Sequence, residues 1–291
     1  MTASIHNTPR ACPREGVGAR SILITGCSSG IGYATAKSLS KRGYRVFASA
    51  RKMEDVEKLK REGLNTVQLD LAHSDSIQNA LQQVLAQTNG ELYALFNNGA
   101  YGQPGAVEDL SRDVLRQQFE TNLFGTVELT NLVIPIMRKQ GYGRIIQCSS
   151  ILGFIALKYR GAYNASKYAL EGINDTLRLE LQGSGIYVSS IQPGPISTRF
   201  RANSLAMYQK NINAENSFHK KIYQAMVERL QKAGAAVPFT LPPDAVVKKV
   251  IHALESRRPK NHYAVTFPTY LFALLKRILP SRLLDKILGS L

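Results

Sequence analysis

Short apolar runs alternate with helix-like patterns from Ser21 onward, and this alternation constrains the fold more than any other feature of the chain. The expected strands cover residues 20–25, 44–49, 65–69, 92–96, 144–148 and 187–192. The expected helices cover residues 30–42, 56–61, 76–86, 114–139 and 162–181. Strands that alternate with helices pair in parallel through right-handed crossovers, which place helices on both faces of the sheet. The sequence therefore predicts an α/β fold with one doubly wound parallel sheet.

Length and composition agree with a single globular domain. The chain has 291 residues and a hydrophobic content of 44%, which suffices for one large domain with a buried core. The three cysteines, Cys12, Cys27 and Cys148, form no CxxC pair. This usage is typical of a reducing compartment and predicts a cytoplasmic protein. The five histidines have no metal-ligand spacing, so no metal site is expected.

The net charge of +16 has several readings. A basic chain can contact nucleic acid or an anionic membrane, or it can carry a well-solvated surface. The basic residues here are spread along the chain, and no recognised nucleic-acid motif accompanies them. We therefore expect no nucleic-acid partner, and some of the charge is expected to face the phosphates of a dinucleotide.

A glycine-rich segment, TGCSSGIG at residues 25–32, joins the first expected strand to the first expected helix. Glycines at such a junction allow a tight turn and a close backbone approach to phosphate, and the helix N-terminus adds a positive dipole. The spacing is G-x-x-x-G-x-G, which differs from the common G-x-G-x-x-G pattern. Cys27 is expected to be only a small residue of the turn. The residues expected to bind a dinucleotide here are Gly26, Ser28, Ser29, Gly30, Ile31 and Gly32.

Tyr163 and Lys167 stand four residues apart in the segment YNASK, inside the expected helix 162–181. Residues i and i+4 share a helix face, so the lysine ammonium can lie near the phenolic oxygen. A phenol with a pKa of about 10 is a poor acid or base at neutral pH, and a fixed cation lowers that pKa. Such a pair alone also fits an exposed helix surface. Together with the glycine loop upstream, it indicates an enzyme that uses Tyr163 as general acid and base.

The end of the second expected strand predicts which dinucleotide is bound. An acidic residue there hydrogen-bonds the NAD ribose and repels a 2′-phosphate. This chain has Ala50 at that position, and Arg51 follows it. A guanidinium binds phosphate through two parallel hydrogen bonds, so Arg51 favours NADP(H). The alternative is that Arg51 is only a surface loop residue.

Six motifs in this order resemble those of the short-chain dehydrogenase/reductase family, over about residues 21–198. Besides the glycine loop, they include NNGA at residues 97–100, which resembles the family's NNAG with its last two residues exchanged. The resemblance implies a Rossmann fold and NADP(H)-dependent oxidoreduction. It implies a catalytic set of Asn122, Ser150, Tyr163 and Lys167, and the thirteen-residue spacing to Tyr163 favours Ser150 over Ser149. Further cofactor contacts implied by the resemblance are Asp70, Leu71, Asn97, Tyr163, Lys167, Pro193, Ile196 and Thr198.

The resemblance also implies a role for each catalytic residue. Tyr163 exchanges the proton with the substrate oxygen, while Lys167 lowers the pKa of Tyr163 and holds the nicotinamide ribose. Ser150 hydrogen-bonds the substrate oxygen, and Asn122 anchors a water chain. Alone, Asn122 reads equally as a polar helix residue or a local kink.

The regions outside the motifs give the domain boundaries and the expected substrate class. Residues 1–20 lack an apolar signal segment and are expected to be a flexible extension, followed by the dehydrogenase domain over 21–266. Residues 199–237 form a helical substrate lid in the family, and apolar side chains occur there and between Ser150 and Tyr163. The chain is similar to the branch with 17β-hydroxysteroid and retinol dehydrogenases and bacterial aldehyde-reducing relatives. This similarity implies a lipophilic aldehyde or ketone and its alcohol as substrates.

The tail over residues 267–291 has an amphipathic pattern with basic residues beside its apolar face. Such a helix either lies on an anionic membrane or docks on its own domain or a partner subunit. The long helices predict a homodimer or homotetramer, as in relatives. A non-catalytic NADP(H)-binding sensor or a membrane-associated scaffold remains the alternative function, although neither explains why Ser150, Tyr163 and Lys167 occur together. Turnover of a carbonyl compound would separate these alternatives.

Overall fold

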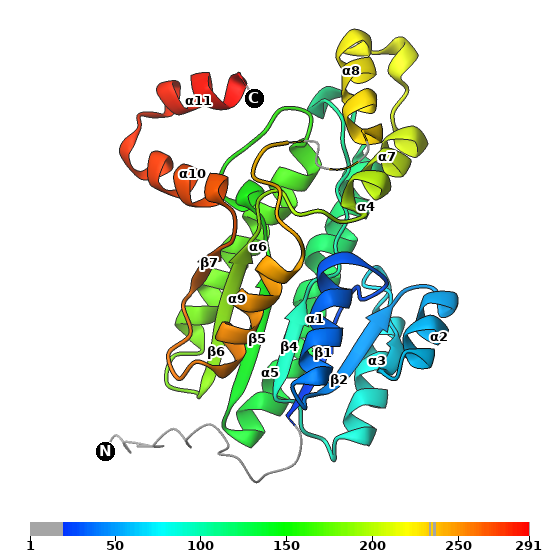
Figure 1. The fold of residues 1–291 in the computed structure, drawn as a ribbon, viewed down its shortest axis with the longest axis vertical. Helices are drawn as coiled ribbons and strands as arrows, with labels where there is room; N and C mark the ends of the chain where they lie inside the picture. Colours follow the sequence, from blue (N-terminus) through cyan, green and yellow to red (C-terminus); the bar gives the residue numbers. More distant parts are fainter. Residues whose placement is uncertain (1–19, 233, 235–236, 291) are drawn as a thin grey trace.

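The computed structural model describes residues 20–290 except 233, 235 and 236 (Figure 1). The expected flexible extension therefore lies outside the described residues, apart from Arg20. Seven strands form one parallel sheet in the order β3-β2-β1-β4-β5-β6-β7. The strands are β1 Ser21–Ile24, β2 Arg45–Ala50, β3 Asn65–Gln68, β4 Ala94–Asn97, β5 Gly143–Cys148, β6 Ile186–Gln192 and β7 His262–Ala264. The doubly wound α/β fold predicted from the sequence is confirmed.

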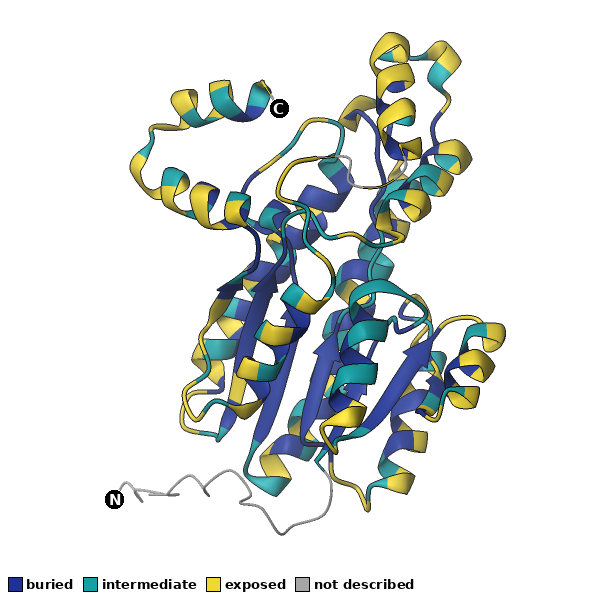
Figure 2. Cartoon of the chain, in the orientation of Figure 1, coloured by how far each residue is buried: buried dark blue, intermediate teal, exposed yellow. Residues whose placement is uncertain are grey.

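Helices cover both faces of the sheet because the central strands are apolar on both faces. In β1, Ile22 and Ile24 pack towards one layer and Leu23 packs towards the other, as the two-residue period of a strand requires. The first layer contains α1 Gly30–Lys41, α2 Met53–Arg61 and α9 Asp244–Glu255. The second contains α3 Ser74–Gln87, α5 Gly125–Gln140 and α6 Gly161–Glu180. Figure 2 shows the resulting buried sheet between two half-exposed helix layers.

Two elements differ from the expectation. The single helix expected over 114–139 is divided into α4 Arg112–Phe119, a π-helical segment η2 Glu120–Phe124, and α5. The continuous helix was a wrong prediction, because a local change in hydrogen-bond register leaves the apolar period almost intact. The second difference is the pair α9 and β7, which the sequence reading did not identify. With three residues, β7 is too short for a periodic signal.

Two helical additions lie beyond the carboxyl edge of the sheet (Figure 1). The segment expected to form a lid contains α7 Phe200–Asn211 and α8 Lys220–Gln231, whose buried faces meet around Tyr208 and Tyr223. The tail contains α10 Phe267–Ile278 and α11 Ser281–Gly289. Short 3-10 helices occur as well, at η1 Val107–Asp109, η3 Ile151–Gly153 and η4 Ala214–Asn216. Over the part of the chain that is described, no helix combines the length and the apolar content needed to cross a bilayer.

The inner face of the tail packs on the domain. Phe272 of α10 and Leu288 of α11 are buried in one apolar cluster with Leu152, Ile155 and Tyr163. The Lys276 ammonium donates a 2.5 Å hydrogen bond to the Phe154 carbonyl. The tail therefore forms part of the wall around Tyr163.

Candidate active site

The predicted site residues come together at the carboxyl edge of the parallel sheet. In a doubly wound sheet the loops that follow the strands converge there, and ligands bind in the crevice between them. The glycine loop follows β1, Arg51 follows β2, and Asp70 follows β3. Ser150 follows β5, Pro193 follows β6, and α6 carries Tyr163 and Lys167. Residues that lie as far apart in the chain as Gly26 and Thr198 thus surround one region.

The glycine loop has the geometry of a phosphate site. Gly26 has a φ of +70°, which a residue with a side chain rarely adopts. A Cβ on Gly32 would lie 2.4 Å from the Gly26 carbonyl oxygen, so that position has no room for a side chain. Ser29 precedes α1 without making a side-chain cap, which leaves the first amide groups of the helix available. These features fit the pyrophosphate of a dinucleotide.

The two asparagines at the end of β4 have different roles; Asn97 is the last residue of the strand and Asn98 follows it. The Asn97 side chain is buried and donates to Thr130 Oγ1 at 2.9 Å, so it points into the fold. The Asn98 side chain donates to the carbonyl oxygens of Thr25 and Gly26 at 3.0 and 3.1 Å, and it fixes the glycine loop. Asn97 was the residue expected at the cofactor, whereas the side chain that shapes the loop belongs to Asn98. Two successive asparagines in the sequence do not reveal which one has this role.

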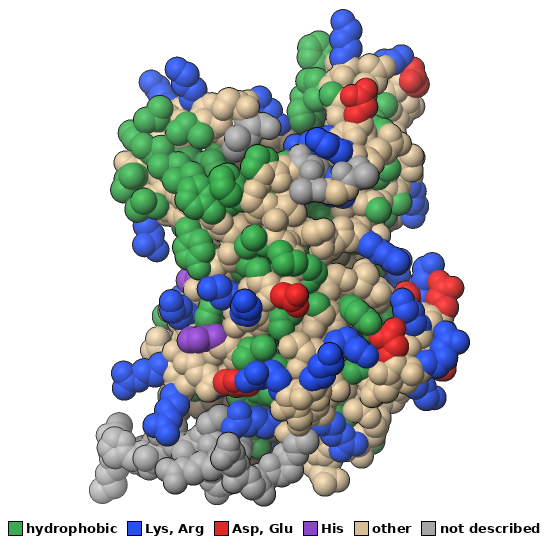
Figure 3. Space-filling model, in the orientation of Figure 1, with side chains coloured by type: hydrophobic (Ala, Val, Ile, Leu, Met, Phe, Trp, Pro, Cys, Tyr) green, Lys and Arg blue, Asp and Glu red, His purple; other side chains and the backbone are tan. Residues whose placement is uncertain are grey.

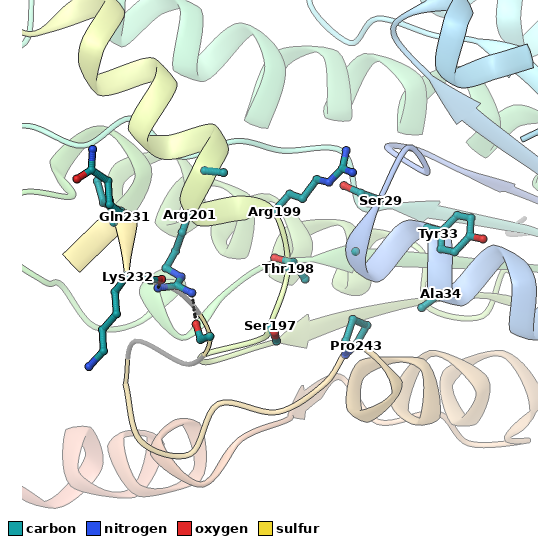
Figure 4. Close-up of a pocket in the computed structure, with 14 residues that line it drawn as sticks. Ser29, Tyr33, Ala34, Ser197, Thr198, Arg199, Arg201, Gln231, Lys232 and Pro243 are labelled. Atoms are coloured by element: carbon teal, nitrogen blue, oxygen red, sulfur yellow. Dashed lines mark hydrogen bonds between the residues drawn. The ribbon is translucent and has the colours of Figure 1, made fainter. Parts of the chain in front are cut away.

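A cavity of about 630 Å³ opens beside the glycine loop. Ser29 and Gly30 line one side of it, and Thr198 and Arg199 line the other (Figure 4). In Figure 4 the Arg199 side chain extends towards Ser29. The lid contributes Lys232 and Arg201, and Arg201 donates a 3.0 Å hydrogen bond to the Lys232 carbonyl. The positive lining suits the phosphates of a dinucleotide; the sequence reading did not single out Arg199, although a basic residue directly after the PGPIST segment was visible.

Tyr163 lies in an apolar environment. Only 8% of its surface is exposed, and the Phe200 ring packs edge-on against it with a centroid distance of 5.3 Å. Burial raises the pKa of Tyr163 well above its usual value, and the Ser150 hydroxyl partly opposes this increase. Burial thus has the largest effect on the pKa of Tyr163, and it acts in the opposite direction to the lowering expected from Lys167. The phenol is protonated at neutral pH, as proton donation requires.

Lys167 and Ser150 flank Tyr163. The Lys167 ammonium lies 5.7 Å from the centre of the Tyr163 ring and donates a 2.7 Å hydrogen bond to the Cys148 carbonyl. Burial lowers the pKa of Lys167, and the negative charge of Glu171 partly opposes this change. Ser150 Oγ accepts a 3.0 Å hydrogen bond from the Leu152 amide, which fixes the position of the hydroxyl. The alternative serine, Ser149, is also buried.

Asn122 sits in the π-helical segment η2, which turns its side chain towards α6. Its amide group donates to Ser166 Oγ at 3.1 Å and to the Tyr101 carbonyl at 2.9 Å, and its oxygen accepts from the Tyr101 amide. Ser166 in turn donates to the carbonyl oxygen of Tyr163. A chain of hydrogen bonds therefore connects Asn122 to the helix turn that carries Tyr163. Isolated π-helical turns occur often at functional sites.

The remaining predicted cofactor contacts surround the same edge. Arg51 is exposed; burial raises the pKa of Tyr101 to about 12, and the Arg51 charge partly opposes this rise. Asp70 accepts a hydrogen bond from the Ala72 amide through its side chain, and Leu71 is buried beside the loop after β4. The Pro193 carbonyl accepts a 2.8 Å hydrogen bond from the Ile151 amide. This bond ties the segment that contains Pro193, Ile196 and Thr198 to the loop that begins at Ser150.

Comparison with known proteins identifies the family. A family model described as short chain dehydrogenase matches residues 20–209. The oxidoreductase YbbO of Escherichia coli K12 is 44% identical over 269 residues, which cover 92% of this chain and 94% of that protein. The NADPH-dependent 3-dehydrocapnine reductase of Ornithobacterium rhinotracheale is 31% identical, covering 92% of this chain and 95% of that protein. The 3-ketodihydrosphingosine reductase of Bacteroides thetaiotaomicron is 38% identical over 183 residues, 62% of this chain and 66% of that protein.

Solved structures share the fold. A short-chain dehydrogenase/reductase from Burkholderia phymatum in complex with NAD superposes with a TM-score of 0.74 at 22% identity, covering 88% of this chain and 92% of that one. The actinorhodin polyketide ketoreductase with NADPH gives a TM-score of 0.69 at 25% identity, covering 85% and 95%. The fold thus accommodates either dinucleotide. The chain belongs to the short-chain dehydrogenase family of NAD(P)-dependent oxidoreductases.

Proposed function

We propose that this protein is an NADP(H)-dependent reductase of lipophilic aldehydes or ketones, with Tyr163 as the general acid. The observation that carries the proposal is the environment of Tyr163. A phenol kept protonated by burial lies between Ser150 and Lys167, and the surrounding side chains are apolar. Bound NADPH supplies the hydride, and the chain supplies the proton and the orientation of the carbonyl group.

Each catalytic side chain has one task in this proposal. Tyr163 donates its proton to the carbonyl oxygen during reduction and accepts a proton from the alcohol in the reverse direction. Ser150 donates a hydrogen bond to the same oxygen, while its own oxygen accepts from the Leu152 amide and so holds the hydroxyl group in place. Lys167 stabilises the phenolate that forms and holds the ribose. Asn122 orders the polar groups behind α6 through which the proton is replaced.

The preference for NADP(H) rests on Arg51. Among the residues that the structure describes, Arg51 has no acidic partner, whereas the neighbouring Lys52 pairs with Glu54 at 3.1 Å. A free guanidinium at the end of β2 is suited to a 2′-phosphate. The Ornithobacterium relative carries NADPH dependence in its name, which supports the same choice. The remaining proposed contacts are those of the glycine loop, Asp70, Leu71, the backbone at Asn97, Pro193, Ile196 and Thr198.

Replacing Arg51 with aspartate is expected to reverse the cofactor preference. Loss of a charge-assisted hydrogen bond and gain of repulsion lower kcat/KM for NADPH by about tenfold to 100-fold, while activity with NADH is retained or increased. Steady-state kinetics with both cofactors measure this ratio. Lys52→Asp is the matched control, since Lys52 already has a partner. Equal losses in the two variants would contradict the proposed role of Arg51.

Apolar side chains from three regions support a lipophilic substrate. Leu152 and Ile155 come from the segment before α6, Phe272 and Leu288 come from the tail, and all four share a cluster with Tyr163. Phe200 at the start of the lid covers the Tyr163 ring. Relatives named for a keto form of dihydrosphingosine and for dehydrocapnine are in keeping with a carbonyl group on a larger molecule.

Removing the Phe200 ring is expected to weaken substrate binding more than it slows the chemical step. Phe200→Ala loses an aromatic contact to Tyr163, so KM for a long-chain aldehyde rises about fivefold to tenfold while kcat changes less. Initial rates over a range of aldehyde concentrations separate the two parameters. Phe218→Ala is the control, because Phe218 lies in the same lid segment and is 95% exposed. An unchanged KM in Phe200→Ala would argue against this wall of the pocket.

We also propose a homodimer or homotetramer and a peripheral membrane contact through the tail. Exposed Phe124 and Leu179, next to and on the long helices α5 and α6, suit a subunit interface. The tail has an exposed apolar face besides the inner face that packs on the domain. We further propose that the chain consists of an extension over residues 1–20, a dehydrogenase domain over 21–266 with a lid over 199–237, and a tail over 267–291. We expect the protein to be in the cytoplasm.

NADPH oxidation by the purified protein tests the enzymatic proposal. The substrate panel consists of aliphatic, aromatic, retinoid and steroid carbonyl compounds, each supplied with NADPH or NADH. We expect NADPH-dependent reduction that is fastest with the more apolar compounds. Tight NADPH binding without turnover of any carbonyl compound would instead support the sensor alternative.

A further inference from the structure

A second cavity, of about 500 Å³, lies beneath α10 and shares no residue with the cavity beside the glycine loop. Its lining includes four basic side chains: Lys249 of α9, Lys260 before β7, and Lys276 and Arg277 of α10. The rest of the lining includes His262, Tyr263 and Tyr270, and none of the described carboxylates lines the cavity. Four cations around one hollow repel each other unless an anion compensates them.

These charges have little compensation inside the protein. Lys249, Lys260 and Arg277 form no ion pair with any residue that the structure describes. Two acids, Glu171 and Asp175, contact Gln192 or His262 of the lining, and both also have partners outside it. Glu171 accepts from Ser190 and Gln192 at 2.7 and 3.0 Å and faces His262. Asp175 pairs with Arg178 at 2.7 Å and also faces His262. The cavity is therefore suited to an external anion.

Helix α10 places this cavity beside an exposed apolar surface. Phe267, Leu271, Leu274 and Ile278 recur at the spacing of one helix face, and they are 36% to 62% exposed. We call these four residues the apolar stripe. Figure 3 shows the hydrophobic side chains in this part of the molecule with basic side chains around them. On the helical wheel, Tyr270 and Arg277, which line the cavity, lie directly next to the stripe.

We propose that the cavity binds the phosphate headgroup of an anionic phospholipid while the apolar stripe inserts into the bilayer leaflet that faces the protein. This inference rests on the membrane contact proposed above and identifies the lipid chemistry that the contact recognises. A cation-lined hollow next to an apolar stripe matches a lipid, whose phosphate and acyl chains are adjacent. A two-fold pairing of this surface with a second copy of the chain would bring the same uncompensated cations together. A second copy is therefore an unfavourable partner for this surface.

The position of the stripe has a functional consequence. The opposite face of α10 carries Phe272, which packs in the cluster that contains Tyr163. One helix thus separates the proposed bilayer surface from the reacting group. A carbonyl compound dissolved in the bilayer would therefore be held on the side of the molecule where α10 packs against the Tyr163 cluster.

Vesicle sedimentation with the full-length protein tests the proposal. Binding to phosphatidylcholine vesicles is compared with binding to vesicles that also contain phosphatidylglycerol. We expect binding to the anionic vesicles only. The cavity variant Lys249→Gln/Lys260→Gln/Arg277→Gln is expected to lower the partition coefficient at least about tenfold. The matched control, Lys41→Gln/Lys248→Gln/Arg258→Gln, removes the same charge from exposed positions outside the cavity and is expected to stay within about twofold of the wild type.

Further arms separate the other outcomes. Leu271→Ser/Leu274→Ser should also weaken vesicle binding, and it should leave the oligomeric state in solution unchanged. Equal losses of vesicle binding in the cavity variant and the control would show that binding depends only on general charge attraction. This result would contradict the proposed lipid site. Saturable binding of glycerol 3-phosphate without vesicle binding would identify a soluble phosphate ligand instead, and dissociation of an oligomer by the serine variant would identify a subunit interface. Turnover of a short, water-soluble aldehyde is measured in parallel, so that failure of the enzymatic proposal is distinguishable from failure of the lipid site.

Discussion

Replacing Tyr163 with phenylalanine is expected to lower kcat for carbonyl reduction by about 10² to 10⁴-fold, the usual contribution of a positioned general acid. The variant removes only the hydroxyl group, and the ring remains packed against Phe200 and the tail. The fold and the affinity for NADPH should therefore change little. Single-turnover measurements of NADPH oxidation, with NADPH binding followed separately by fluorescence, determine both quantities.

Tyr168→Phe is the matched control for this experiment. Tyr168 lies on the same helix, five residues after Tyr163, and is 40% exposed. Its variant should keep the activity of the wild type. If Tyr163→Phe also kept normal activity, proton transfer by Tyr163 would be excluded, and Ser150 would have to be considered as the acid.

Adding a single methyl group at Gly32 is expected to weaken NADPH binding by about 100-fold or more, because the loop must move to admit it. The new Cβ would meet the Gly26 carbonyl oxygen at 2.4 Å and the side-chain amide nitrogen of Asn98 at 2.6 Å. Both atoms shape the loop that is proposed to bind the pyrophosphate. Titration of Gly32→Ala with NADPH measures the loss, and thermal unfolding shows whether the rest of the fold is retained.

Gly172→Ala provides the comparison for Gly32→Ala. Gly172 lies on the exposed side of α6, and a Cβ there would meet nothing within 4 Å. Alanine is favoured over glycine inside a helix by up to about 1 kcal/mol, so this variant should be at least as stable as the wild type and bind NADPH normally. Normal NADPH binding by Gly32→Ala as well would mean that the dinucleotide does not depend on this loop.

The layered fold could be predicted from the sequence because each element carries its own period. Strand β1 contains a continuous apolar run over residues 22–24, β5 contains the apolar pair Ile145 and Ile146, and α1 and α6 follow the helical period between turn residues. The π-helical turn around Asn122 could not be predicted, because it changes backbone hydrogen bonds without changing the residue pattern. The strand β7 owes its place to pairing with β6, a long-range contact that three residues do not encode locally.

The position of the motif residues in the fold could be predicted, but their local contacts could not. The motif positions fall at one edge of the sheet, as expected from strand ends in a parallel sheet. The direction of each side chain depends on neighbours distant in sequence, such as Thr130 for Asn97 and Thr25 for Asn98. The position of Phe272 beside Tyr163 could not be predicted for the same reason, because it depends on how the tail packs against the domain.

The most direct test of the central claim is the decrease in nicotinamide absorbance when the purified protein is mixed with NADPH and a lipophilic aldehyde, with Tyr163→Phe measured in parallel. The proposed reductase should consume NADPH in step with alcohol formation, faster than it consumes NADH, and the variant should lose this activity while still binding NADPH. No carbonyl-dependent NADPH consumption by the wild type across the whole panel, or equal rates in the wild type and the variant, would contradict it.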